Sequence, residues 1–501
     1  MRDANDGRWQ PRWRGPYILA AICLLLATGS SQTANPTEQV AEHWKDLTTI
    51  DVETAYALLR DNHPAAAPET DDPTFKSALA TAHASALARA AKVTGYEGYV
   101  ATMGEFADAM GDGHIWSHPL FFPRTVEWVG LIAARHGQHW IVASGDDQVS
   151  GSPLVGSRIV SCDGRSADEL ARDVLHYRAV TSVEAEQVLK SGWLLVDEHN
   201  PFLERPHSCI FDSGGKQLTL TLNWSIINRN TLLTQYWKKT YGEAGFGARQ
   251  IGQSYWIAIE ELTPKAQPVI DAITTQKDKI RSSAYVVLDL RGNDGGNSAY
   301  GRLVAEQLYG EDYVASILGV KSDSPCPPVY RASPGNIEAA SNGVRQFEKT
   351  GDSRGAKAYT QALRLMQTAA SKGQSLTIAP DCHTQPLKPL HDSSSLLRAK
   401  LFVLTDAACF SSCIKTVGDF LKLGATQIGE PTGAVTHYSE VRELVLPSGL
   451  STFSTLMAIM TESPLRIGPF VPKYEFDGDI ADTAALEKWV QELALQGART
   501  P

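Results

Sequence analysis

The feature that most constrains this fold is an apolar segment that runs directly into a glycine-rich loop. Residues 284–290 read as a strand, and Arg291-Gly-Asn-Asp-Gly-Gly-Asn297 follows before another helical stretch. Such a strand is typical of a parallel sheet that is covered on both faces. Glycines let backbone N–H groups approach a ligand closely, so the loop can form an oxyanion hole or a phosphate cradle. The alternative is a tight strand-to-helix turn, and the dinucleotide spacing Gly-x-Gly-x-x-Gly is not met.

A second strand–turn–helix segment carries a serine. Residues 401–405 read as a strand, and the helix after Ser411 has apolar positions on one face. The N-terminus of that helix directs unpaired N–H groups and a positive dipole end at the serine. Both features stabilise an alkoxide or an oxyanion. The motif Gly-x-Ser-x-Gly of α/β-hydrolases is absent, so for this serine alone a helix cap is the alternative.

A histidine follows a predicted helix near the N-terminus. Apolar residues between 99 and 110 recur at helical spacing, and Gly111 is expected to end the helix. His114 then lies in a loop of small residues, where it is free to point into a cleft. His118 and His437 are the competing histidines.

The chain divides into segments that differ in their predicted secondary structure. Residues 37–120 are predicted to be a helical region that carries the Asp-Gly-His loop, and residues 125–225 a small β-rich unit. Residues 250–495 alternate strands and helices, which predicts an α/β core. Residues 321–395 are expected to be a helical insertion in that core.

Four segments together resemble a known superfamily. They are Met110–His114, Val287–Gly296, Thr405–Phe420 and Gly429–Gly433, in matching order and spacing over roughly residues 95–480. The chain resembles the serine peptidases of the tail-specific (C-terminal processing) and tricorn-core superfamily, which also includes interphotoreceptor retinoid-binding protein. The resemblance implies an α/β fold with a crotonase/ClpP-like βαβ catalytic core and no metal or organic cofactor.

The resemblance also implies roles for individual residues. Ser411 matches the nucleophile, and His114 matches the general base. The backbone N–H groups of Gly295 or Gly296, together with that of Ser412, match the oxyanion hole.

The choice of base follows from a missing lysine. The tail-specific branch activates its serine with a lysine shortly after Gly-Glu-Pro-Thr, but residues 433–440 contain none. The chain is therefore more similar to the tricorn-like branch, which uses the histidine of the Asp-Gly-His element. In that branch a carboxylate further along the chain supports the site. Glu440 is our candidate, and a structural surface glutamate is the alternative.

The β-rich unit lies where this superfamily often carries a PDZ-like domain. Residues 154–164 resemble the PDZ strand and turn. PDZ domains capture extended peptide ends by strand addition, so the resemblance predicts peptide binding here.

The N-terminus has the pattern of a signal peptide. Four arginines precede an apolar run from Tyr17 to Ala27, and small and polar residues follow. The run is too short to cross a membrane, so residues 1–34 are predicted to be removed on export, with a retained signal anchor as the alternative. A periplasmic or secreted location follows. The formal net charge of −10 argues against nucleic acid and against anionic lipid as partners.

An exported chain favours disulfides. Six cysteines remain after the signal peptide, and an even number fits three bridges, with free buried thiols as the alternative. The expected pairs are Cys162–Cys209, Cys326–Cys382 and Cys409–Cys413.

These observations predict an exported serine peptidase that acts on peptide or protein substrates through an acyl-enzyme. We expect no nucleic-acid partner and no membrane association in the mature form. The alternatives are a non-catalytic ligand-binding protein on the same scaffold, or an esterase or amidase that acts on small molecules.

Overall fold

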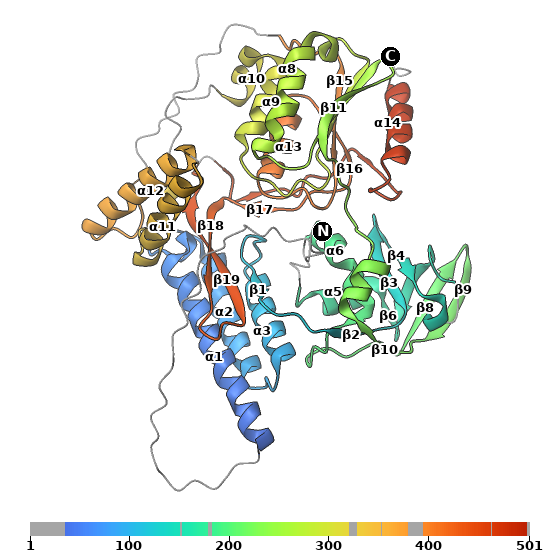
Figure 1. Ribbon diagram of the computed structural model, residues 1–501, viewed down its shortest axis with the longest axis vertical. Coiled ribbons are helices and arrows are strands. Elements are labelled where there is room, and N and C mark those ends of the chain that lie inside the picture. The colour runs from blue at the N-terminus through green and yellow to red at the C-terminus, as the bar shows by residue number, and fades with distance from the viewer. Residues whose placement is uncertain are drawn as a thin grey trace.

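The computed structural model describes residues 36–150, 153–178, 183–319, 328–351, 353–378, 394–461 and 463–497. The expected signal peptide and the cysteines at 326 and 382 lie outside these ranges. The fold is of the α/β class, as predicted, and Figure 1 shows its layers. Among the described residues, no helix combines the length and the apolar character that a membrane crossing requires.

A central sheet of six strands organises the α/β core. The strand order is β11-β12-β13-β15-β16-β21, with parallel pairing except between β11 and β12. The bounds are β11 (Phe246–Ile251), β12 (Ser254–Ile259), β13 (Tyr285–Asp289), β15 (Lys400–Thr405), β16 (Thr426–Gly429) and β21 (Tyr474–Glu475).

Helices cover both faces of this sheet, which explains why its strands read as continuous apolar segments. Along β13, Val286 and Leu288 pack into one hydrophobic cluster, whereas Val287 packs into another. The first cluster lies under four helices and the second under a single helix, α14 (Figure 1). The helices are α8 (Gln267–Arg281), α9 (Ala299–Tyr309), α10 (Glu311–Leu318) and α13 (Ser412–Lys422) on the first face, and α14 (Thr483–Gly497) on the second.

The N-terminal helices pack against a second, antiparallel sheet that includes strands from late in the chain. Phe106 and Phe453 meet in its core, with ring centroids 5.6 Å apart. Nothing in the strand pattern of residues 438–459 indicates that this hairpin leaves the central sheet. The elements are α1 (Pro36–Asn62), α2 (Pro73–Ala90), α3 (Tyr96–Asp108), β1 (Ser117–Pro119), β14 (Val329–Tyr330), β18 (Tyr438–Val445) and β19 (Ser451–Ile459).

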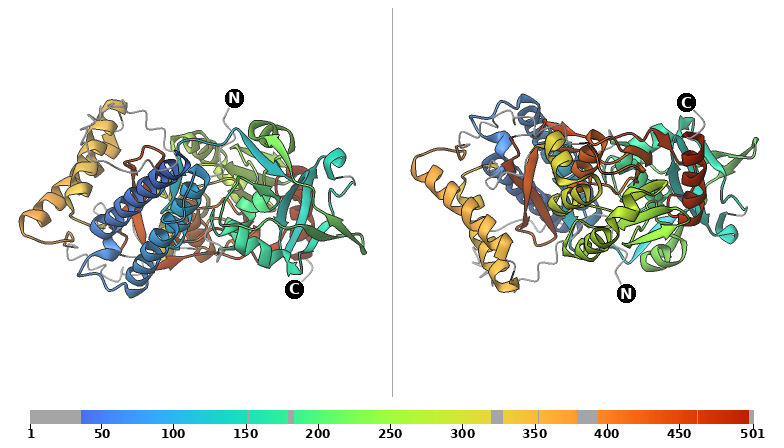
Figure 2. Two further views of the ribbon diagram at one scale, coloured as in Figure 1. Left: turned by 90° about the horizontal axis from the view of Figure 1, so that it is seen from below. Right: turned by 90° about the horizontal axis from the view of Figure 1, so that it is seen from above.

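The insertion contains a helical hairpin, α11 (Pro334–Thr350) and α12 (Ser353–Ser371). Asn336 is fully buried, and its side-chain amide donates to the carbonyl oxygen of Asn62 at 2.9 Å. The hairpin is thus attached to the end of α1, and Figure 2 shows it beside the N-terminal helices in both views.

The β-rich unit has a hydrophobic core of its own. One sheet has the order β3-β4-β5-β8-β9, with β6 beside β5, and a smaller sheet has the order β10-β2-β7. The bounds are β2 (Thr125–Trp128), β3 (Leu131–His136), β4 (His139–Gly145), α4 (Asp147–Ser150), β5 (Arg158–Cys162), β6 (Arg165–Ser166), α5 (Ala167–Leu175), α6 (Glu184–Lys190), β7 (Val196–Asp197), β8 (Ser208–Ser213), β9 (Lys216–Thr221), β10 (Ser225–Asn228) and α7 (Arg229–Thr231).

A disulfide joins two strands of this unit. Cys162 and Cys209 stand opposite each other in the β5–β8 ladder and are bonded, as expected. The bond closes a loop with a sequence separation of 47, which restricts the unfolded chain.

We therefore expect removal of this bond to destabilise the β-rich unit. Replacing both Cys162 and Cys209 by Ala should lower its free energy of unfolding by about 2–4 kcal/mol. Urea unfolding, followed by tryptophan fluorescence, measures the change, because Trp128, Trp140 and Trp193 are buried in the core of this unit. An unchanged midpoint would show that the bond contributes nothing to stability.

Candidate active site

Ser411 lies on the turn between β15 and α13, at the carboxyl end of a buried parallel strand. It caps the N-terminus of α13 with φ 54° and ψ −121°. A positive φ is strained for a residue with a side chain, and such strain is characteristic of serines presented on strand-to-helix turns. The turn therefore holds the hydroxyl at the edge of the sheet.

The residues around Ser411 fix this turn. Cys409 and Cys413 are both fully buried and are bonded to each other across the serine, as expected. The ring of Phe410 lies against the imidazole of His114, with centroids 4.7 Å apart. Gly113 makes room for that ring, because a Cβ there would come within 2.9 Å of it.

Two segments that are 297 residues apart in sequence meet at the serine. His114 Nε2 lies 3.3 Å from Ser411 Oγ, and His114 Nδ1 lies 3.1 Å from Asp112 Oδ1. The backbone N–H of His114 donates to the same Asp112 oxygen at 2.9 Å. The result is a hydrogen-bonded series of carboxylate, imidazole and hydroxyl, an arrangement that can activate a serine.

Asp112 is held as a carboxylate. Burial acts to raise the pKa of Asp112, but the hydrogen bond and charge of His114 and a hydrogen bond from the Thr436 hydroxyl outweigh it. Together these contacts lower the pKa of Asp112 to about 2. An ionised carboxylate beside Nδ1 favours the tautomer in which Nε2 is free to accept the serine proton.

The carboxylate beside the histidine is thus not the one that we selected from the sequence. Glu440, in β18, accepts a hydrogen bond from the hydroxyl of Tyr359 at 3.2 Å, which links it to α12 rather than to His114. The signal for Asp112 was present in the Asp-Gly-His segment itself. A carboxylate that is two residues from a histidine can fold back onto its ring nitrogen.

The glycine loop lies directly beside the serine. A Cβ on Gly295 would come within 2.8 Å of the Ser411 Cβ. The N–H of Gly295 donates to Asn293 Oδ1 at 3.0 Å, so it is already engaged. In the described part of the chain, the N–H groups of Gly296 and Ser412 donate to no other group. Of the expected oxyanion donors, these two are available.

The competing histidines lie elsewhere. His437 precedes β18, stacks edge-on against Tyr438, and has a pKa lowered by burial. His118 lies on β1, where it pairs with Thr452 of β19. The hydrogen-bonding contact with Ser411 Oγ comes from His114.

One group of side chains in the described residues has the spacing of metal ligands: Glu127, Asp197 and His199. The guanidinium of Arg205 forms ion pairs with both carboxylates, at 3.3 Å from its Nε to Asp197 Oδ2. Because a positive charge already balances this group, we assign no metal to it.

Comparison with known proteins finds a family model that matches the region around Ser411. Residues 256–467 match the model of peptidase family S41. The matched residues include the glycine loop and Ser411, whereas Asp112 and His114 lie before them. No curated protein matches the chain significantly.

Solved structures show a similar fold over most of the chain. Mature CPAF is 12% identical, with a TM-score of 0.55, and the match covers 90% of this chain and 97% of that chain. Mature CPAF complexed with lactacystin is 12% identical, with a TM-score of 0.56, and the match covers 91% and 99%. These similarities extend the shared fold to the helices and strands that precede the family match.

The geometry predicts that Asp112 supports His114 and that Glu440 does not. An amide at position 112 cannot hold the required tautomer, so Asp112→Asn should slow labelling of Ser411 by a fluorophosphonate about 10³–10⁴-fold. Glu440→Gln is the matched control and should label at nearly the rate of the unmodified protein. A slow Glu440→Gln variant beside a fast Asp112→Asn variant would reverse the assignment.

Proposed function

We propose that the chain is a serine-type peptidase that cleaves peptide bonds through an acyl-enzyme on Ser411, and the match of residues 256–467 to the model of peptidase family S41 supports this. In this proposal His114 is the general base and Asp112 is its supporting carboxylate. The observation that carries the proposal is the hydrogen-bonded series of Asp112, His114 and Ser411.

The reaction begins when Ser411 Oγ attacks the carbonyl carbon of the scissile bond. His114 Nε2 accepts the hydroxyl proton, and Asp112 stabilises the imidazolium that forms. The carbonyl oxygen becomes an oxyanion and receives the N–H groups of Gly296 and Ser412. His114 then gives its proton to the leaving amine. A water molecule attacks the acyl-enzyme by the same route in reverse and releases the second product.

The proposal also covers the α/β core, the β-rich unit and the N-terminal segment. The parallel strands with their crossing helices form a crotonase/ClpP-like βαβ core, and the β-rich unit is PDZ-like. Its edge strand β9 is largely exposed, which suits an extended peptide that adds as a further strand. We further propose that residues 1–34 direct export to the periplasm or the exterior. The substrates of a peptidase there are peptides or proteins.

Substitution at three positions tests the mechanism. Ser411→Ala should abolish cleavage of a peptide mixture, because the variant lacks the hydroxyl that forms the acyl-enzyme. His114→Ala should lower kcat by about 10³-fold or more, since the serine loses its proton acceptor. His437→Ala is the control and should cleave at close to the normal rate.

The contrary outcomes each point to a different function. Undiminished cleavage by Ser411→Ala would remove the nucleophile assignment, and loss of activity in His437→Ala alone would move the base. Cleavage of small esters but of no peptide would favour an esterase. A protein that binds peptides without cleaving them would favour the non-catalytic alternative.

A further inference from the structure

Asp406 is a buried carboxylate in the turn that leads from β15 to Ser411, and the mechanism above does not use it. Its side chain is fully buried. Oδ2 accepts the backbone N–H groups of Gly242 at 2.8 Å and Gly292 at 2.9 Å. Oδ1 accepts the N–H of Ala408 at 3.1 Å. One side chain therefore holds three backbone amides from three loops.

These loops include both halves of the site. Gly292 opens the glycine loop, which leads to the oxyanion donor Gly296. Ala408 belongs to the nucleophile turn. A second, weaker link runs between the same two segments, because the N–H of Phe410 donates to the carbonyl oxygen of Asn293 at 3.1 Å. Asp406 thus connects the loop that receives the oxyanion to the turn that presents the serine.

The loop that contains Gly242 packs against the glycine loop. Gly292 has φ 72°, and a Cβ there would come within 2.6 Å of the Gly242 carbonyl oxygen. A loop packed this closely leaves little room for Gly292 to move while Asp406 holds both N–H groups.

The charges that face Asp406 come from several elements. Asp289 and Arg291, at the end of β13, form a buried ion pair at 2.7 Å. Glu430, which follows β16, accepts the N–H of Ala407, the residue after Asp406, at 3.3 Å. Tyr241 adjoins Asp406 from the loop of Gly242.

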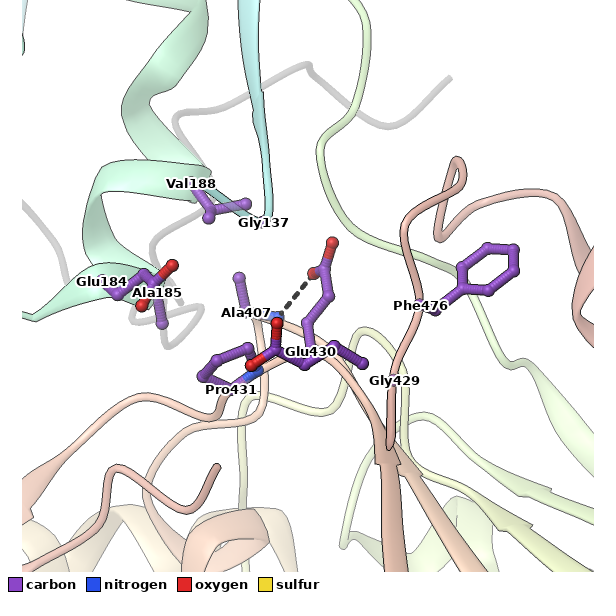
Figure 3. A pocket seen from close by; sticks show the side chains of 10 residues that line it. Gly137, Glu184, Ala185, Val188, Ala407, Gly429, Glu430, Pro431 and Phe476 are labelled. Atoms are coloured by element: carbon purple, nitrogen blue, oxygen red, sulfur yellow. Dashed lines mark hydrogen bonds between the residues drawn. The ribbon is translucent and has the colours of Figure 1, made fainter. Parts of the chain in front are cut away.

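Figure 3 shows Glu430 beside Ala407 in a small pocket that is closed on the other side by Val188 and Glu184 of α6. Burial raises the pKa of Glu430 well above its ordinary value. Burial also raises the pKa of Asp406, to about 7, although the N–H groups of Gly242 and Gly292 and the charge of Arg291 oppose the rise. Ionised Asp406 is the stronger acceptor of three amides.

We propose that Asp406 is a positioning residue, which sets the oxyanion donors of the glycine loop against the Ser411 nucleophile by holding the amides of Gly292 and Ala408 on one carboxylate. The proposal rests on the acyl-enzyme mechanism proposed above. Asp406 touches neither substrate nor reacting atoms, so its effect reaches the reaction through the backbone.

Asp406→Asn is the direct test. The amide keeps the size of the side chain, but its NH₂ group must face at least one of the three N–H donors and release it. Because loss of one oxyanion donor lowers kcat about 10²–10³-fold, a displaced donor should lower kcat at least about tenfold. KM should stay within about twofold, and a peptide aldehyde, which mimics the tetrahedral intermediate, should bind more weakly by a factor similar to the loss in kcat.

The pH profile gives a readout that a structural role alone would not change. In the unmodified protein the acid limb of kcat should include the ionisation of Asp406. In Asp406→Asn that contribution should be lost. A limb of unchanged shape in a variant with a lowered kcat would contradict the proposal.

Leu486→Ala provides the control for stability. Leu486 is fully buried in α14, on the opposite face of the sheet from α13, so its loss destabilises the fold without touching the turn. At a temperature where both variants are folded, Leu486→Ala should have nearly normal kcat. Equal loss of kcat in both variants, or a kcat for Asp406→Asn within twofold of normal, would overturn the proposal.

Two further controls separate the possible failures. If Asp406→Asn does not fold, Asp406→Ser replaces it, because a short hydroxyl leaves room for water but cannot bind all three amides. Labelling of the unmodified protein by a fluorophosphonate is measured beside the variants. Absence of that labelling would refute the proposed function itself, whereas normal labelling with no effect at position 406 would refute only the positioning role.

Discussion

The site depends on the parallel pairing of β13 with β15. Leu288 lies opposite Val403 and Asp289 lies opposite Leu404, so the two strands end at the same edge of the sheet. The glycine loop leaves one strand there, and the turn that carries Ser411 leaves the other. Parallel strands require a crossover between them, which is why two segments that are far apart in sequence become neighbours. The N–H groups and the serine hydroxyl face each other as a consequence of this register.

His114 is held at this edge by residues from a different part of the chain. The β18–β19 hairpin leaves the core and joins the N-terminal helices in a separate sheet. Ser454 of β19 accepts the N–H of Trp116 at 2.7 Å and donates to the carbonyl oxygen of His114 at 2.9 Å. Thr436, just before the hairpin, donates to Asp112. Residues from late in the chain therefore hold the loop that carries the histidine, and both parts of the chain contribute to the candidate site.

The local features of the site could be predicted from the sequence, because they depend on short patterns. The apolar segment before Gly292 predicted a strand buried on both faces, and the residues around Ser411 predicted a strand–turn–helix. The two cysteine pairs within the described residues also matched expectation. Glu440 was chosen because we looked for the supporting carboxylate far along the chain, whereas the carboxylate that contacts the histidine is that of Asp112, two residues away. The role of Asp406 could not be read from the sequence, since it depends on amides from three separate loops.

The central claim is that Ser411 is an activated nucleophile in the full chain, and its chemical modification tests this most directly. The protein is treated with a fluorophosphonate, digested, and the modified residue is located by mass spectrometry. We expect a single adduct on Ser411 that is absent when His114 is replaced by Ala. An unmodified Ser411, or an adduct on another residue with Ser411 untouched, would contradict it.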